Sequence, residues 1–166
     1  MKYYIKQKVF SLRDKFTVKD YSQNDVFQVQ GKFMSLSNKL ELLNMDGSQV
    51  LNSKKQLFRF LPLYHIYSNH DEELATIKKK FSFKPKFEIF AGNDEYEVEG
   101  SFFAHSFVIR KNEQDVASIV KKVFSFGDSY EIDILDESKK ELFLFMVIII
   151  DQIIHEGQKN KIKFNG

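Results

Sequence analysis

Four histidines and one acid in an apolar stretch are the side chains of this sequence best suited to chemistry. The histidines are His65, His70, His105 and His155, and none pairs with another histidine or with a cysteine at metal-ligand spacing. We interpret them as surface or turn residues. Asp151 interrupts a long apolar run. Its carboxyl could be a buried functional acid, but we favour a position near an opening of the core, where water or a lysine satisfies it.

Motifs that carry known reactions are missing. The sequence contains no G-x-S-x-G nucleophile elbow, no G-x-x-x-x-G-K-[ST] phosphate loop and no G-x-G-x-x-G fingerprint. Met45-Asp46-Gly47 resembles the start of a calcium loop, but the ligand positions after it are wrong, so it predicts a hairpin turn. The sequence therefore predicts no catalytic residue, no metal site and no cofactor, and we expect the protein not to be an enzyme.

Length, charge and composition narrow the class of protein. The chain has 166 residues, two prolines and no linker-like tract, so residues 1–166 are expected to form a single domain. A net charge of +2 does not indicate a nucleic-acid partner. Met1 to Phe10 alternates in polarity and does not resemble a signal peptide, and cysteine is absent. We expect a cytoplasmic protein.

The chain is organised around one apolar stretch, from Leu142 to Ile154. It is too short for a transmembrane span, so a helix formed by it must be buried in a core. Ser138 and Glu141 form a capping-box pattern, and Gly157 is suited to a helix end, so we predict a central helix over 139–156 with a short basic tail at 157–166. The β-branched run 147–150 favours a strand, but the length of the stretch favours a helix. The side chains expected to form the helix core are Leu142, Phe145, Met146, Ile149, Ile150 and Ile153.

Before this helix, alternating segments separated by polar turns predict twelve strands within residues 3–135. They are Tyr3–Phe10, Lys15–Asp20, Val26–Lys32, Asn38–Asn44, Gln49–Lys55, Leu63–Ser68, Leu74–Phe81, Lys86–Ala91, Glu95–Ser101, Ala104–Arg110, Asp115–Val123 and Ser129–Leu135. Similar segments beginning at Ala75 and Ala117 indicate an internal duplication. Short connections imply an antiparallel meander, and a helix apolar on every side needs an enclosing sheet. We predict a mainly β fold, a closed 12-stranded antiparallel β-barrel enclosing the hydrophobic C-terminal helix.

Several short motifs resemble those of one protein family. They are Ile5-Lys-Gln-Lys-x-Phe-Ser, Asp14-x-Phe16-x-Val18-x-Asp20, Phe27-x-Val29-x-Gly31-Lys32, and the Ala-x-Ile-x-Lys-Lys segments at Ala75 and Ala117. The sequence resembles the LURP-one-related proteins of the tubby C-terminal-like superfamily, which also includes phospholipid scramblases. The resemblance implies a 12-stranded barrel around a C-terminal helix. Tubby-type members bind phosphoinositides, but no residue-level match to their lipid site is present.

In an up-and-down meander the two barrel rims differ in charge. Turns after even-numbered strands hold 12 of the 23 acids, whereas the ends of odd-numbered strands and their loops are rich in lysine and phenylalanine. This basic rim is the candidate for binding an anionic surface. Its candidate residues are Lys54, Lys55, Lys78, Lys79, Lys80, Lys84, Lys86, Lys121, Lys122, Phe83 and Phe126, with Phe33, Phe58, Phe60, Phe81 and Phe124 nearby. The rings could instead fold inward and plug the barrel end, leaving the lysines as a solvated face.

The leading functional hypothesis is a non-enzymatic cytoplasmic binding module, peripheral at the membrane. Its basic rim would recognise an anionic membrane lipid with a phosphoinositide-like headgroup, or an acidic protein partner. The alternative is a structural or protein–protein scaffold without a lipid ligand, and a third possibility is scramblase-like or hydrolytic activity. A monomer is expected. Lys111, in a polar turn, is expected to tolerate reversal of its charge.

Overall fold

The structure is a computed structural model that describes the backbone of residues 1–6, 16–32, 39–101, 106–124 and 127–164. Side chains are described for the same residues except 6, 16, 32, 121, 123–124, 127–128 and 155–164. The strands are β1 (Lys2–Lys6), β2 (Phe16–Asp20), β3 (Asp25–Lys32), β4 (Lys39–Asn44), β5 (Gln49–Lys55), β6 (Leu63–Ser68), β7 (Glu73–Lys79), β8 (Lys86–Ala91), β9 (Asp94–Ser101), β10 (Ser106–Lys111), β11 (Gln114–Phe124) and β12 (Gly127–Ile134).

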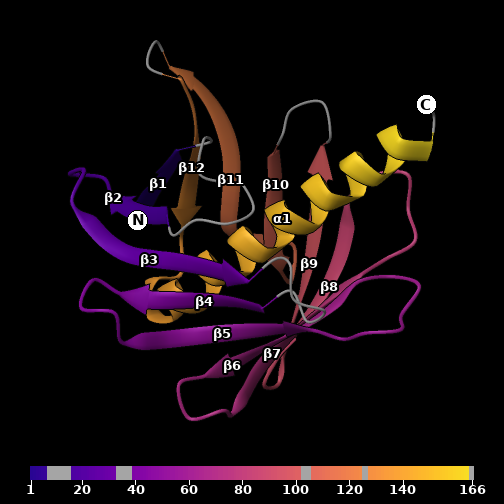
Figure 1. Cartoon of the computed structure of the whole chain (residues 1–166), viewed down its shortest axis with the longest axis horizontal. Helices are drawn as coiled ribbons and strands as arrows, with labels where there is room; N and C mark the ends of the chain where they lie inside the picture. Colours follow the sequence, from indigo (N-terminus) through magenta and orange to yellow (C-terminus); the bar gives the residue numbers. More distant parts are fainter. Residues whose placement is uncertain (7–15, 33–38, 102–105, 125–126, 165–166) are drawn as a thin grey trace.

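Within these described ranges, the twelve strands form a closed antiparallel barrel in which each strand pairs with its neighbours in sequence (Figure 1). The pairing of β1 with β12, from Lys2 opposite Asp133 to Lys6 opposite Ser129, closes the sheet. The predicted fold class is therefore confirmed. Parts of some predicted strands, residues 7–10, 15, 38 and 104–105, lie outside the described residues.

Alternation of buried and exposed side chains along the strands creates the barrel core. On β12, Tyr130, Ile132 and Ile134 are fully buried, whereas Glu131 and Asp133 between them are partly exposed. A period of two places successive side chains on opposite faces of a strand, so one face of each strand lines the lumen. The apolar lining therefore encloses a space that only an apolar element can fill.

Helix α1 (Lys140–Phe164) fills that space. Phe143 to Ile150 are all buried, as is Ile153, and Leu142 is half-buried. The β-branched run 147–150 is helical although its residues favour a strand. The barrel is already closed and offers no free edge for another strand, and this tertiary context overrides the weak local preference. In Figure 1 the helix begins at the lower left of the barrel and ends at the upper right.

Both predicted ends of the helix need correction. Asp136, not Ser138, provides the cap: its carboxylate accepts a hydrogen bond from the Ser138 backbone N–H at the start of a 3₁₀ turn, η2 (Glu137–Lys139). The helix then continues through Gly157 to Phe164, past the predicted end at Glu156. A glycine within a helix costs only about 1 kcal/mol, which is too little to end a helix by itself. The residues predicted as a basic tail therefore continue the helix backbone to Phe164.

The two rims have different kinds of connection. The turn rim is formed by the short turns at 21–24, 45–48, 69–72, 92–93 and 112–113, and α1 begins there. The loop rim is formed, within the part of the chain that the structure describes, by the longer loops 56–62 and 80–85, which lie toward the right in Figure 1. Positive φ angles at Gly47 and Gly92 fit the tight hairpins of the turn rim.

Candidate functional site: a rim of exposed phenylalanines

The two loops of the loop rim carry the same five-residue pattern. One reads Phe58-Arg59-Phe60-Leu61-Pro62 and the other reads Phe81-Ser82-Phe83-Lys84-Pro85. Both prolines of the chain are therefore the last residues of these patterns. Proline fixes its own φ angle and favours an extended conformation in the residue before it. The pattern Phe-x-Phe-x-Pro was visible in the sequence, but only the barrel register shows that its two copies lie on one rim.

Backbone hydrogen bonds hold the two loops beside each other. The Gln56 N–H donates to the Leu63 carbonyl at 2.8 Å and closes the first loop, and the Lys80 N–H donates to the Lys86 carbonyl at 2.8 Å and closes the second. The Lys79 N–H, at the end of β7 where the second loop begins, donates to the Pro62 carbonyl at 3.0 Å. The two loops therefore emerge beside each other on the loop rim.

Close packing at Gly100 supports the second loop. The Gly100 N–H donates to the Pro85 carbonyl at 2.9 Å. A Cβ atom at Gly100 would lie 3.1 Å from the Cβ of Pro85 and 3.2 Å from the Cβ of Phe107. Pro85 is itself buried, so the end of the loop is fixed against β9. Any larger residue at position 100 would therefore push against the loop end or the neighbouring strand.

The phenylalanines of both loops point into solvent. The exposed fractions are 105% for Phe58, 92% for Phe60, 85% for Phe81 and 101% for Phe83. We call these four residues the phenylalanine rim. Of the two alternatives from the sequence, inward plug or outward surface, these rings take the second. Phe33, Phe124 and Phe126 lie outside the described side chains. Apolar surface gathered in this way marks sites of protein or membrane contact.

Phe58 also has an unusual backbone. Its φ angle is +59°, in the left-handed region that non-glycine residues rarely adopt. This conformation costs about 1 kcal/mol or more, and strained positions of this kind cluster at functional sites. No packing of the fully exposed ring within the described residues offsets the cost. Both the backbone conformation and the exposure of Phe58 are thus features typical of a functional site.

The predicted basic residues do not all gather at the phenylalanine rim. Lys54 extends toward the turn rim, where its Nζ lies 4.8 Å from the Tyr67 ring centroid and 3.9 Å from Asp71. Lys80 forms an ion pair with Glu88, and Lys86 lies 3.8 Å from Glu99. Each of these lysines therefore lies close to an acid, either in the 69–72 turn or on the sheet.

Other predicted lysines lie near the loops. Lys78 and Lys84 are exposed, and neither forms an ion pair with any residue that the structure describes. Lys55 and Lys79 are half-buried at the ends of β5 and β7, with the Lys55 Nζ 5.9 Å from the Tyr64 ring centroid. Lys122 is half-buried on β11. The side chain of Lys121, like that of Phe126, lies outside the described side chains.

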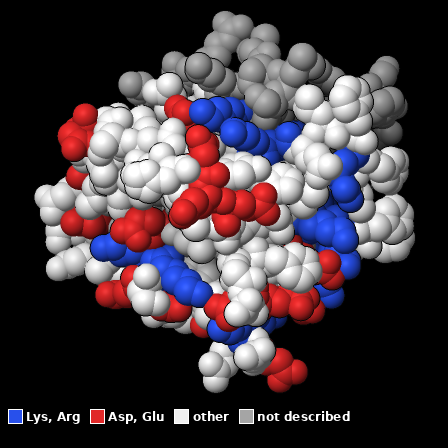
Figure 2. Space-filling view, turned by 90° about the horizontal axis from the view of Figure 1, so that it is seen from below, with Lys and Arg blue, Asp and Glu red and all other residues white. Residues whose placement is uncertain are grey.

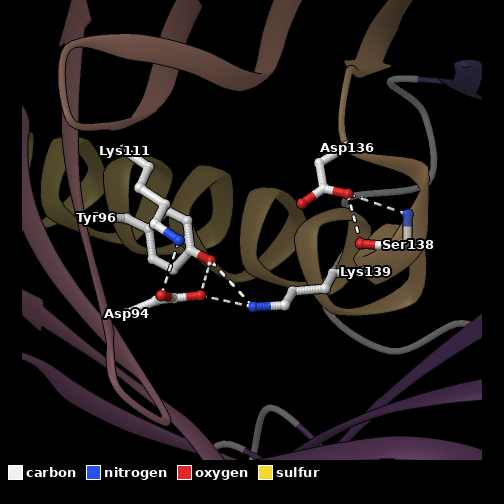
Figure 3. A network of polar contacts seen from close by, with 6 residues as sticks. All are labelled: Asp94, Tyr96, Lys111, Asp136, Ser138 and Lys139. Carbon is white, nitrogen blue, oxygen red and sulfur yellow. Dashed lines mark hydrogen bonds and ion pairs between the residues drawn. The ribbon is translucent and has the colours of Figure 1, made fainter.

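The turn rim is less acidic than the turn sequences imply. Figure 3 shows Lys111 and Lys139 converging on Asp94, with both Nζ–carboxylate distances at 2.7 Å. The Tyr96 hydroxyl donates to the same carboxylate at 3.2 Å, and the buried Tyr96 ring packs edge-on against Phe143 of α1. Hydrogen bonds from Lys111 and Lys139 hold the pKa of Asp94 well below its usual range.

This cluster fastens the start of the helix to β9 and β10, which the sequence did not indicate.

The charges elsewhere on the surface are also mixed in sign. Seen from below in Figure 2, blue side chains gather toward the right and the upper edge, and red ones lie over the centre and left with some blue among them. The separation of charge between the rims is partial.

Inside the barrel, Asp151 is 5% exposed, and burial raises the pKa of its carboxyl to about 7. Among the described residues no group of three or more histidines, cysteines or acids could hold a metal ion. Within the part of the chain that the structure describes, no helix is both long and apolar enough to span a bilayer. Asp151 therefore belongs to the interior of the barrel.

A closed 12-stranded barrel with a helix through its lumen, bearing loops on one rim, defines the structural class. The family model described as LURP-one-related matches residues 1–151, and the chain belongs to this family. The Bacillus subtilis (strain 168) protein YxjI is 29% identical over 159 residues, covering 96% of this chain and 97% of that protein. An X-ray structure of an Arabidopsis thaliana protein matches with a TM-score of 0.60 and 21% identity, covering 90% of this chain and 89% of that one, and it shows the shared fold.

Proposed function

We propose that the protein is a non-enzymatic binding module that docks on an anionic membrane surface through the phenylalanine rim. The observation that supports this most is the full exposure of Phe58, Phe60, Phe81 and Phe83 in two neighbouring loops. Arg59 and Lys84 are exposed between and beside these rings. Aromatic rings that enter the lipid and cations that remain at the headgroups are the combination that interfacial binding uses.

The energy available is sufficient for reversible docking. Burying a phenylalanine contributes about 1.5–3 kcal/mol, so four rings contribute at most roughly 6–12 kcal/mol. A dissociation constant of 1 μM corresponds to a net binding free energy of about 8 kcal/mol. The burial energy of the rings must also offset the cost of immobilising the protein, so the net free energy is smaller than their sum. The rim therefore suits a peripheral protein that binds weakly to moderately and leaves the barrel outside the membrane.

Sedimentation with liposomes containing phosphatidylserine tests this proposal. The variant carries Phe58→Ser, Phe60→Ser, Phe81→Ser and Phe83→Ser. A matched control removes exposed apolar side chains from the opposite rim through Tyr21→Ser, Met45→Ser and Leu135→Ser, at positions exposed by 71%, 43% and 60%. Circular dichroism establishes that both variants are folded.

We expect the wild type and the control to sediment with the liposomes and the four-serine variant to remain in the supernatant. A wild type that ignores anionic liposomes at low salt would overturn the proposal. Equal sedimentation of the wild type and the four-serine variant would also overturn it, because another surface would then be responsible for binding.

A further inference from the structure

On the loop rim the exposed apolar side chains are gathered more closely than the positive charges. Lys80 pairs with Glu88, Lys86 lies 3.8 Å from Glu99, which Arg110 also approaches, and Lys54 points away toward Asp71. A headgroup carrying several phosphates is normally held by cations and N–H donors that converge on it. Arg59 and Lys84 are exposed on two different loops, and no ion pair or hydrogen bond within the described residues draws the two side chains toward one site.

A shallow, open depression of about 450 Å³ is lined by Lys111, Asn112, Gln114, Asp115, Val116, Leu135 and Asp136 at the turn rim. Its lysine already contacts Asp94, and Asp115 and Asp136 make the surroundings unfavourable for an anion. This depression is on the opposite side of the barrel from the phenylalanine rim.

The loop tips instead have the form of small apolar wedges. In each loop two phenylalanines are separated by one residue, and the following proline fixes the chain where it returns to a strand. The bond from Lys79 to Pro62 and the contact of Gly100 with Pro85 fix the proline end of each loop against a strand before any ligand arrives. A surface that is ordered in advance loses little conformational entropy on binding.

The geometry points to the acyl region exposed at lipid-packing defects as the ligand of the phenylalanine rim, in place of a phosphoinositide headgroup. This inference rests on the membrane docking proposed above. Side chains on an interfacial element reach only about 5–10 Å into the boundary between headgroups and acyl chains, and such binding depends on curvature and lipid composition. Highly curved bilayers expose more of this boundary, so the protein binds them in preference to flat ones.

Three vesicle preparations separate this inference from recognition of a headgroup. Small sonicated and large extruded vesicles share one mixture of phosphatidylcholine and phosphatidylserine. A third preparation of large vesicles replaces phosphatidylserine with a phosphoinositide at matched surface charge. Each is tested by sedimentation at low and high salt with the wild type, with Phe83→Ser, and with a variant carrying Arg59→Gln and Lys84→Gln.

We expect binding to small vesicles to exceed binding to large ones by several-fold and to persist largely at high salt. Phe83→Ser should lower binding about tenfold or more, since burying one phenylalanine is worth at least a decade in affinity. The glutamine variant should retain most of its binding at high salt. Selective binding to the phosphoinositide vesicles without dependence on vesicle size would overturn the inference and leave the proposed membrane docking intact. Binding to no vesicle would overturn both.

Discussion

The carbonyl oxygen of Pro62 accepts a 3.0 Å hydrogen bond from the backbone N–H of Lys79, and this contact ties the first phenylalanine-bearing loop to the end of β7, where the second one begins. Each loop ends at a proline, and each proline is fixed by a backbone contact to a different strand: Pro62 to β7 and Pro85 to β9. The barrel therefore positions four exposed rings that lie far apart in sequence on one surface.

Support of the second loop by β9 predicts the effect of Gly100→Ala. The added Cβ would lie 3.1 Å from Pro85 and 3.2 Å from Phe107, so the loop must shift to relieve the contact. We expect the free energy of unfolding to fall by about 1–3 kcal/mol and vesicle binding to weaken, measured by denaturant unfolding and sedimentation. Glu97→Ala, at an exposed position on the same strand, should change stability by less than about 0.5 kcal/mol. An unchanged midpoint for Gly100→Ala would mean that the loop end is not packed as described.

The cap at the helix start predicts unequal effects for two neighbouring substitutions. Asp136→Ala removes the carboxylate that accepts from the Ser138 N–H and hydroxyl, and it should cost about 0.5–2 kcal/mol. Ser138→Ala removes only the hydroxyl contact and should cost less. Thermal melts of the two variants compare them directly. A larger loss for Ser138→Ala would restore the capping box that the sequence suggested.

The fold could be predicted from the sequence because its signals are local. Alternation at Tyr130-x-Ile132-x-Ile134 identifies the inward face of a strand, and the length of the apolar stretch identifies the helix. The helix end predicted at Glu156, just before Gly157, was wrong because a glycine can also lie within a helix when the residues after it are helical. Whether the rim phenylalanines point outward or inward depends on which loops meet after the barrel closes. No local sequence pattern contains this information.

Lys111 illustrates the same limit and gives a revised prediction. Its place in a turn suggested tolerance to charge reversal, but its Nζ lies 2.7 Å from Asp94, a contact across two strands that also involves Lys139. Lys111→Glu places like charges together and should lower the melting temperature. Lys84→Glu, an exposed lysine of the loop rim, should leave it nearly unchanged. Equal melting temperatures for the two variants would argue against the cluster in Figure 3.

Asp151 predicts a dependence of stability on pH. Burial raises the pKa of its carboxyl to about 7 in the folded protein, above the ordinary value of 3.8 in the unfolded chain. Between these values the folded state binds the extra proton, so this group makes stability fall as pH rises from about 4 to 7 and level off above that. Asp151→Asn should increase the free energy of unfolding at pH 8 by about 1 kcal/mol or more, because one pKa unit corresponds to about 1.4 kcal/mol. It should also flatten the decline measured by urea unfolding across this range. A decline of the same size in Asp151→Asn would assign it to other groups.

Insertion of the phenylalanine rim into lipid can be measured directly, because the chain contains no tryptophan. Phe83→Trp places a single tryptophan at a fully exposed rim position, and Tyr21→Trp places one at the turn rim, where the side chain is 71% exposed. On adding vesicles that contain phosphatidylserine and brominated acyl chains, the account predicts a blue shift and quenching for Phe83→Trp and neither for Tyr21→Trp. An unshifted, unquenched Phe83→Trp signal on vesicles that the protein demonstrably binds would contradict it.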